Sequence, residues 1–114
     1  MSLMAMAGSE MIRYNPSSNA IESSTNRGMT WFKRVSCSGM GRIRALVSHK
    51  GELVLCSDQG IYFSSNKGLT WFKRNSSDRN FVDMQDLGTE LMATTSDGRV
   101  YVSSSGGFCW FKRG

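Results

Sequence analysis

The chain has 114 residues, 39% of them hydrophobic, and a formal net charge of +5. That length allows one domain at most, and no stretch approaches the roughly 18 apolar residues of a membrane span. Residues 1–7 lack a basic region and are too short for a secretory signal, so we expect a cytoplasmic protein with no membrane partner.

The first part of the chain, residues 1–35, is predicted to form four short strands. Residues 15–19 form the turn between the second and third strands, and Pro16, the only proline, lies there without cost because a turn does not need its N–H. Apolar and β-branched residues place the strands. The predicted strands are residues 3–7, 11–14, 20–22 and 29–34.

The middle part, residues 36–75, shows the same plan most clearly. His49-Lys50-Gly51 reads as a turn, in which we interpret His49 as a solvated residue. The run Leu53-Val54-Leu55 does not alternate between apolar and polar, as expected of a sheet covered on both faces. The predicted strands are residues 42–48, 53–56, 61–63 and 70–74.

The last part, residues 76–114, repeats the plan a third time, and no segment of helical length shows a 3.6-residue period. The predicted strands are residues 81–84, 91–94, 100–102 and 109–113. We therefore predict a single repeat domain, residues 1–114, of the all-β class.

The tetrapeptide Trp-Phe-Lys-Arg begins at Trp31, Trp71 and Trp110, at spacings of 40 and 39 residues. Four strands repeated at this period are typical of a propeller blade. The expected fold is three four-stranded antiparallel propeller blades, half of a six-bladed β-propeller that a second chain completes.

The turn before each tryptophan carries the most specific pattern. A short polar side chain at its third position can bond the backbone of its own turn, glycine at the fifth position permits a positive φ, and the tryptophan ring covers the hairpin. We assign a structural role to Ser24, Asn26, Gly28, Thr30, Trp31, Ser64, Asn66, Gly68, Thr70, Trp71, Ser103, Ser105, Gly107 and Trp110.

These turns resemble the Asp-box, the bacterial-neuraminidase (BNR) repeat with the pattern Ser-x-Asp-x-Gly-x-Thr-Trp. The resemblance implies a hairpin between the third and fourth strands of a blade, with a structural and not a catalytic role. Asn26, Asn66 and Ser105 stand where the family has Asp, and Cys109 stands where it has Thr. Without a carboxylate in these turns, a metal site there has little support.

A sialidase, by the same resemblance, needs a cluster of three arginines, a Tyr–Glu pair and an Asp that acts as the acid. Arg42-Ile43-Arg44 lacks the proline of the family's Arg-Ile-Pro segment, and the acids fall mostly at turns or strand edges. We expect no catalytic residues, no cofactor and no metal, but a non-catalytic binding or scaffolding module for a glycan or a protein. The alternative is a remnant or subunit of a sialidase-like glycoside hydrolase. The candidate binding residues are Arg42, His49, Lys50 and Arg79.

The cysteines and the basic residues support two further expectations. Cys37, Cys56 and Cys109 do not occupy matching positions, so we expect reduced structural thiols. Six of the 14 basic residues belong to the repeated Lys-Arg pairs, which we interpret as a solvated outer edge. The other interpretation is a basic band for an acidic partner such as an anionic glycan or nucleic acid, and nucleic acid is the less favoured.

Three blades form an open arc whose two ends need covering. A second copy of the chain, joined head to tail, would close six blades as a homodimer. The alternatives are a piece of a longer propeller and a monomer. The end faces are expected to present Leu3, Met4, Met6, Met11, Ile12, Ile21, Phe108, Trp110 and Phe111.

Overall fold

The computed structural model describes residues 3–75 and 81–113, which form strands and turns and contain no helix. The first sheet consists of β1 (Met4–Ala7), β2 (Glu10–Asn15), β3 (Ala20–Ser24) and β4 (Phe32–Ser36). The second consists of β5 (Ile43–His49), β6 (Glu52–Ser57), β7 (Gly60–Ser64) and β8 (Phe72–Asn75). The third consists of β9 (Phe81–Asp86), β10 (Leu91–Thr95), β11 (Val100–Ser103) and β12 (Phe111–Lys112).

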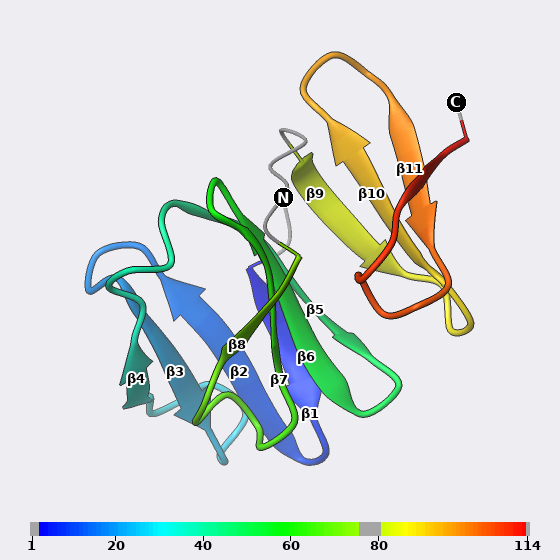
Figure 1. The fold of residues 1–114 in the computed structure, drawn as a ribbon. Coiled ribbons are helices and arrows are strands. Elements are labelled where there is room, and N and C mark those ends of the chain that lie inside the picture. Colours follow the sequence, from blue (N-terminus) through cyan, green and yellow to red (C-terminus); the bar gives the residue numbers. More distant parts are fainter. Residues whose placement is uncertain (1–2, 76–80, 114) are drawn as a thin grey trace.

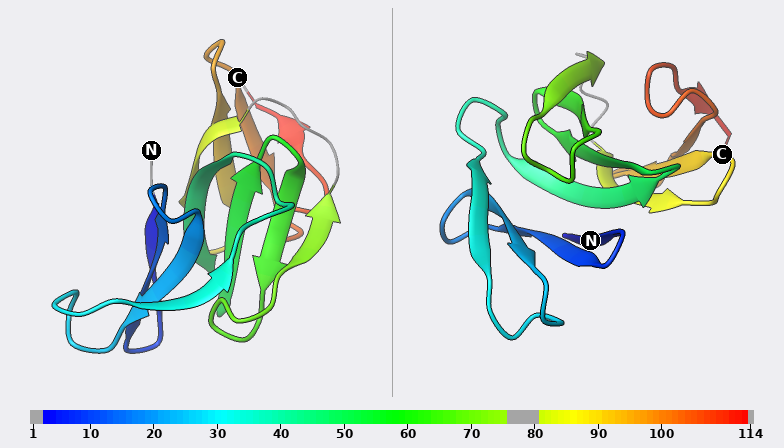
Figure 2. Two further views of the ribbon diagram at one scale, coloured as in Figure 1. Left: turned by 90° about the vertical axis from the view of Figure 1, so that its left-hand side faces the viewer. Right: turned by 90° about the horizontal axis from the view of Figure 1, so that it is seen from below.

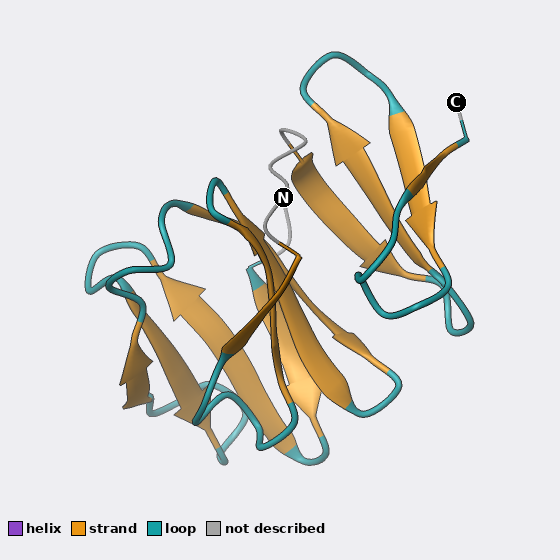
Figure 3. Cartoon of the chain, in the orientation of Figure 1, coloured by secondary structure: helices purple, strands orange, loops and turns teal. Residues whose placement is uncertain are grey.

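Each sheet is an antiparallel meander in which consecutive strands pair with each other (Figures 1 and 3). The prediction of an all-β chain with three four-stranded antiparallel sheets is confirmed. In the part of the chain that the structure describes, no helix is long and apolar enough to span a bilayer.

The three sheets are arranged as a fan. The first strands β1, β5 and β9 lie next to one another, and the last strands β4, β8 and β12 point outward and apart, as the view from below shows (Figure 2). This arrangement is compatible with propeller-like blades, in which the innermost strands surround the axis.

The second sheet is covered on both faces, as the run Leu53-Val54-Leu55 predicts. Leu53 and Leu55 pack with Ile12 and Ile21 against the first sheet. Val54, between them, points to the other side and joins the core with the third sheet. That second core also contains Ala45, Val47, Cys56, Ile61, Phe81, Met84, Leu91, Ala93 and Trp110.

The expected composition of the end faces is partly wrong. Ile12 and Ile21 are fully buried against the second sheet, and Trp110 is buried against it from the other side. Met4 and Met6 do lie on the open side, at 51% and 49% exposure. The error arises because neighbouring residues of a strand point to opposite faces, so that only the register shows which face each residue occupies.

The last strand of each sheet begins one residue after the tryptophan and not before it. The preceding residues are held in the turn by side-chain hydrogen bonds, so their backbone does not join the sheet. We name these turns the box loops; they are residues 24–31, 64–71 and 103–110.

Candidate functional site

The first box loop is closed by its own polar side chains. Ser24 Oγ accepts the Gly28 N–H at 2.9 Å and donates to Asn26 Oδ1 at 2.8 Å. Asn26 Oδ1 accepts the Thr30 N–H at 2.9 Å, and Asn26 Nδ2 donates to Thr30 Oγ1 at 2.9 Å. The second loop repeats these bonds with Ser64, Asn66, Gly68 and Thr70. Polar groups that hold their own backbone in this way have little capacity left for a ligand.

The third box loop keeps the backbone bonds of this network. Ser103 Oγ accepts the Gly107 N–H and Ser105 Oγ accepts the Cys109 N–H, both at 2.9 Å. Ser105 has no amide group to reach position 109, so the bond between the third and seventh side chains is lost with the asparagine. The indole N–H of Trp110 donates to the Gly107 carbonyl at 3.0 Å and fixes the ring over the turn.

The box glycines also pack against the preceding sheet. Gly68 has a φ of 89°, and a Cβ there would lie 3.2 Å from Ile21 Cγ2. Gly107 has a φ of 104°, and a Cβ there would lie 3.0 Å from Ile61 Cγ2. The second and third box loops therefore need glycine both for their backbone conformation and for their close approach to the third strand of the sheet before them.

Two of the three arginines that end the Trp-Phe-Lys-Arg segments, Arg34 and Arg74, tie neighbouring sheets together. Arg34 Nη2 contacts Glu10 Oε2 at 2.6 Å, and Arg34 Nη1 donates to the Lys67 carbonyl of the second box loop at 3.0 Å. The hydrogen bond from Arg34 lowers the pKa of Glu10, against an opposing effect of burial. The Lys67 ammonium, 3.5 Å from Glu10, adds to the pair.

The same contact recurs between the second and third sheets. Arg74 donates to both carboxylate oxygens of Glu52, at 2.9 and 3.1 Å, and to the Gly106 carbonyl of the third box loop at 3.1 Å. Its guanidinium also lies over the Phe63 ring, 3.6 Å from the centroid. The expectation of a solvated edge is wrong for these arginines, since their side chains are only 18% and 8% exposed at Arg34 and Arg74. The lysines Lys33, Lys73 and Lys112 beside the tying arginines are exposed, as expected.

The interpretation of His49 as a solvated turn residue is also wrong. It is the last residue of β5, its side chain is 2% exposed, and its Nδ1 lies 2.7 Å from Asp86 Oδ1 of β9. The hydrogen bond from His49 lowers the pKa of Asp86, which also accepts the Gly88 N–H. His49 therefore joins the second and third sheets. Its partner is 37 residues away, so no local pattern indicates the pair.

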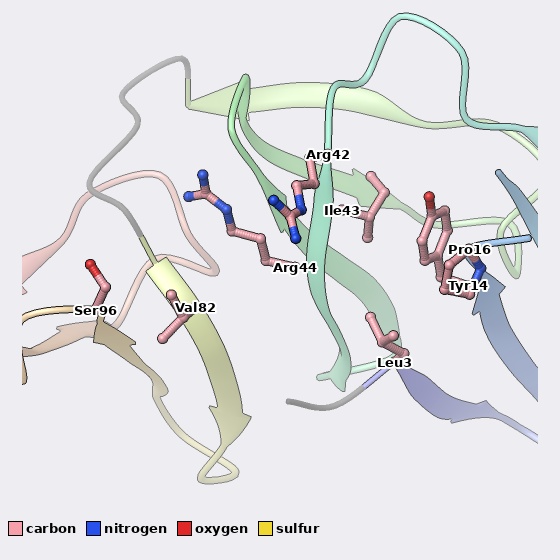
Figure 4. A pocket seen from close by; sticks show the side chains of 8 residues that line it. All are labelled: Leu3, Tyr14, Pro16, Arg42, Ile43, Arg44, Val82 and Ser96. Atoms are coloured by element: carbon pink, nitrogen blue, oxygen red, sulfur yellow. The ribbon is translucent and has the colours of Figure 1, made fainter.

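A cavity of about 660 Å³ lies where the three sheets meet and receives side chains from all three (Figure 4). Figure 4 shows Arg42 and Arg44 between the residues of the first sheet and those of the third. Tyr14 lines the cavity on the side of the first sheet, next to Pro16, and its hydroxyl donates to Asn19 Oδ1 at 2.7 Å. The lining residues are Leu3, Tyr14, Pro16, Arg42, Ile43, Arg44, Val82 and Ser96.

The four candidate binding residues do not form one site. Arg42 lines this cavity, just before β5 begins, whereas His49 and Lys50 lie at the other end of that strand. They line a separate cavity of about 250 Å³ beside Arg74 and the third box loop. Arg79 lies outside the described residues. Arg44 is the cavity residue that the sequence-based choice missed; its position two residues after Arg42, within the predicted strand 42–48, is the signal that indicates it.

Two acids at turns, Asp58 and Asp97, accept hydrogen bonds that hold the chain locally. Asp58 accepts the Arg42 N–H at 2.9 Å, and Asp97 accepts a hydrogen bond from Thr95 Oγ1 within its turn. Residues 3–75 and 81–113 contain no group of three or more His, Cys, Asp or Glu side chains placed to hold a metal ion.

The cysteines divide into two buried thiols and one exposed thiol. Burial raises the pKa of Cys37 to about 11 and that of Cys56 to about 12, and Cys109 is exposed. We expect one fast-reacting thiol with an aromatic disulfide reagent at pH 8, and three after denaturation, because only a thiolate attacks the reagent. Cys109→Ser should remove the fast phase. A second fast thiol in the native protein would contradict the burial of Cys37 and Cys56.

Comparisons with protein-family models and with curated proteins give no match for this chain. The resemblance to the Asp-box therefore rests on the three repeated loops and on their place between the third and fourth strands of each sheet.

Proposed function

We propose that the protein is a non-catalytic binding module of Asp-box-like propeller blades, which takes a glycan or a protein segment in the cavity where the three sheets meet. The observation that carries the proposal is the cavity of about 660 Å³ between the three sheets. Ligand sites combine apolar walls with a few polar groups, and this cavity offers Leu3, Ile43 and Val82 beside two guanidinium groups.

The chemistry of the lining supports binding over hydrolysis. Glycoside hydrolysis requires two carboxyl groups at a defined separation, and none of the described lining residues carries one. Guanidinium groups are donors only, so Arg42 and Arg44 suit the hydroxyl, carbonyl or carboxylate oxygens of a sugar or peptide. The rival function remains the sialidase-like glycosidase, for which no described residue of the cavity supplies the acid.

A glycan array tests the proposal, with a parallel assay on fluorogenic glycosides. We expect saturable binding to a small set of glycans, weakened about tenfold or more by Arg42→Ala, because one charge-assisted hydrogen bond contributes about 1.5–3 kcal/mol. Lys33→Ala, an exposed basic residue on β4, is the matched control and should leave binding unchanged.

Turnover of a glycoside that is lost on removal of a specific acid would contradict the proposal. An array without any bound glycan would instead assign the cavity to a protein segment, which a peptide panel with the same two variants then tests.

A further inference from the structure

The same set of contacts forms the joint between the first and second sheets and the joint between the second and third sheets. At each of these two joints, an arginine is paired with a glutamate of its own sheet and donates to the carbonyl of the fourth residue of the next box loop. The fifth residue of that loop is a glycine that packs on an isoleucine of the third strand, Ile21 or Ile61, three residues before that strand's box serine.

The third sheet presents to solvent the arginine–glutamate half of such a joint. Arg113 pairs with Glu90 at 3.5 Å, and its side chain is 56% exposed, against 18% for Arg34 and 8% for Arg74. Val100, three residues before Ser103, stands where the other sheets have isoleucine, and it is half-buried. The donor pair and the packing position of a further joint are therefore both present on the open side of the third sheet.

The first sheet presents the other half of such a joint, which is a box loop. The fourth residue of its box loop is Arg27, which is exposed and has the same φ of 63° as Lys67 in the second loop. The following Gly28 has a φ of 89°, equal to that of Gly68. The first loop thus has the backbone shape that receives Arg34 at the second loop, but it lies on the open side of the first sheet.

We infer that Arg113 and Glu90 of one chain bind the Arg27 loop of a second copy, and that the reciprocal contact closes two chains into a six-sheet ring. The inference rests on the proposed propeller arrangement and specifies its partner. At this joint Arg113 donates to the Arg27 carbonyl, Gly28 packs on Val100, and the Arg27 side chain pairs with Glu90 as Lys67 pairs with Glu10.

The polarity of the open faces supports a joint between separately folded chains. Where the second sheet offers Ala45, Val47 and Val54 to its neighbour, the third offers Asp83, Gln85 and Met92. The open face of the first sheet carries the Arg13–Glu22 ion pair, at 2.8 Å, beside its methionines. Faces of mixed polarity remain soluble before assembly, whereas the two internal joints are apolar because they never separate.

Light scattering on two variants and on their mixture tests this head-to-tail joint. We expect the natural chain to have twice the mass of 12.7 kDa. Arg113→Glu and Arg27→Glu should each weaken the dimer about tenfold or more, since each places like charges at both joints. Both side chains are exposed in the single chain, so folding is not at risk. Lys112→Glu, with the same charge change next to Arg113, should leave the dimer intact.

In an equimolar mixture of the two variants, a mixed dimer has one joint with only native residues, whereas its other joint carries both changes. The native joint alone should hold an open dimer, so the mixture should contain more dimer than either variant alone at the same total concentration. A monomeric natural chain, a variant that dimerises as tightly as the natural chain, or a mixture with no more dimer than its two variants would overturn the inference. A mass that keeps growing with concentration would also overturn it, because it shows an open chain of copies. None of these outcomes bears on the cavity, whose ligand binding is measured separately.

Discussion

Replacing Arg74 by Ala is expected to lower the free energy of unfolding by about 2–3 kcal/mol. The side chain is 8% exposed, binds both oxygens of Glu52, and holds the third box loop through the Gly106 carbonyl. Its removal leaves a carboxylate without its partner in a half-buried joint. This loss is smaller than the loss on breaking a fully buried ion pair, because Glu52 is 29% exposed and water partly solvates its carboxylate once Arg74 is removed.

Urea denaturation of three variants measures this contribution. Arg34→Ala should have a smaller effect in the same direction, because its side chain is 18% exposed and makes no bidentate pair with Glu10. Lys73→Ala is the matched control, next to Arg74 on β8 and exposed, and should change stability by less than about 0.5 kcal/mol. Equal effects of Arg74→Ala and Lys73→Ala would contradict a tying role for the arginine.

Trp110→Ala is expected to have a larger effect, a loss of about 3–5 kcal/mol that unfolds much of the chain at room temperature. The ring is 7% exposed and lies 4.8 Å from the Phe81 ring, in the core between the second and third sheets. Its indole N–H also fixes the Gly107 carbonyl. The substitution therefore removes a core side chain and loosens a box loop together.

Thermal unfolding followed by circular dichroism tests this expectation. Phe111→Ala is the control, an aromatic neighbour that is 64% exposed and should cost less than about 1 kcal/mol. If both variants unfold at the same temperature, the tryptophan does not belong to the core. A fully unfolded Trp110→Ala chain beside a folded Phe111→Ala chain would agree with the structure.

The sequence predicts the sheets well because their signals are local. Turn residues and β-branched runs mark all twelve strands to within three residues, and the unbroken run at Leu53-Val54-Leu55 reveals a sheet covered on both faces. The shortest strand, β12, is only Phe111–Lys112 in the structure, where residues 109–113 are predicted. There the serines of the third box loop hold the backbone in the turn.

The joints between sheets are harder to predict because their contacts join residues far apart in the chain. Arg74 lies 22 residues from Glu52 and 32 from Gly106, and His49 lies 37 from Asp86. A signal for the ties does exist in the sequence: Glu10, Glu52 and Glu90 each stand at or next to the start of the second strand of their sheet. The repeat of the glutamate beside the repeat of the arginine indicates a pair, although only the structure shows the box carbonyl that completes it.

X-ray scattering from the natural chain in solution tests the six-sheet ring most directly. A single chain has a radius of gyration of 13.2 Å, calculated over its Cα atoms. Two copies joined as a ring should give a clearly larger radius, a mass of twice 12.7 kDa, and a distance distribution that a closed disc fits better than an elongated particle. A radius near 13.2 Å with the mass of one chain would contradict the ring and leave the open faces of the first and third sheets exposed to solvent.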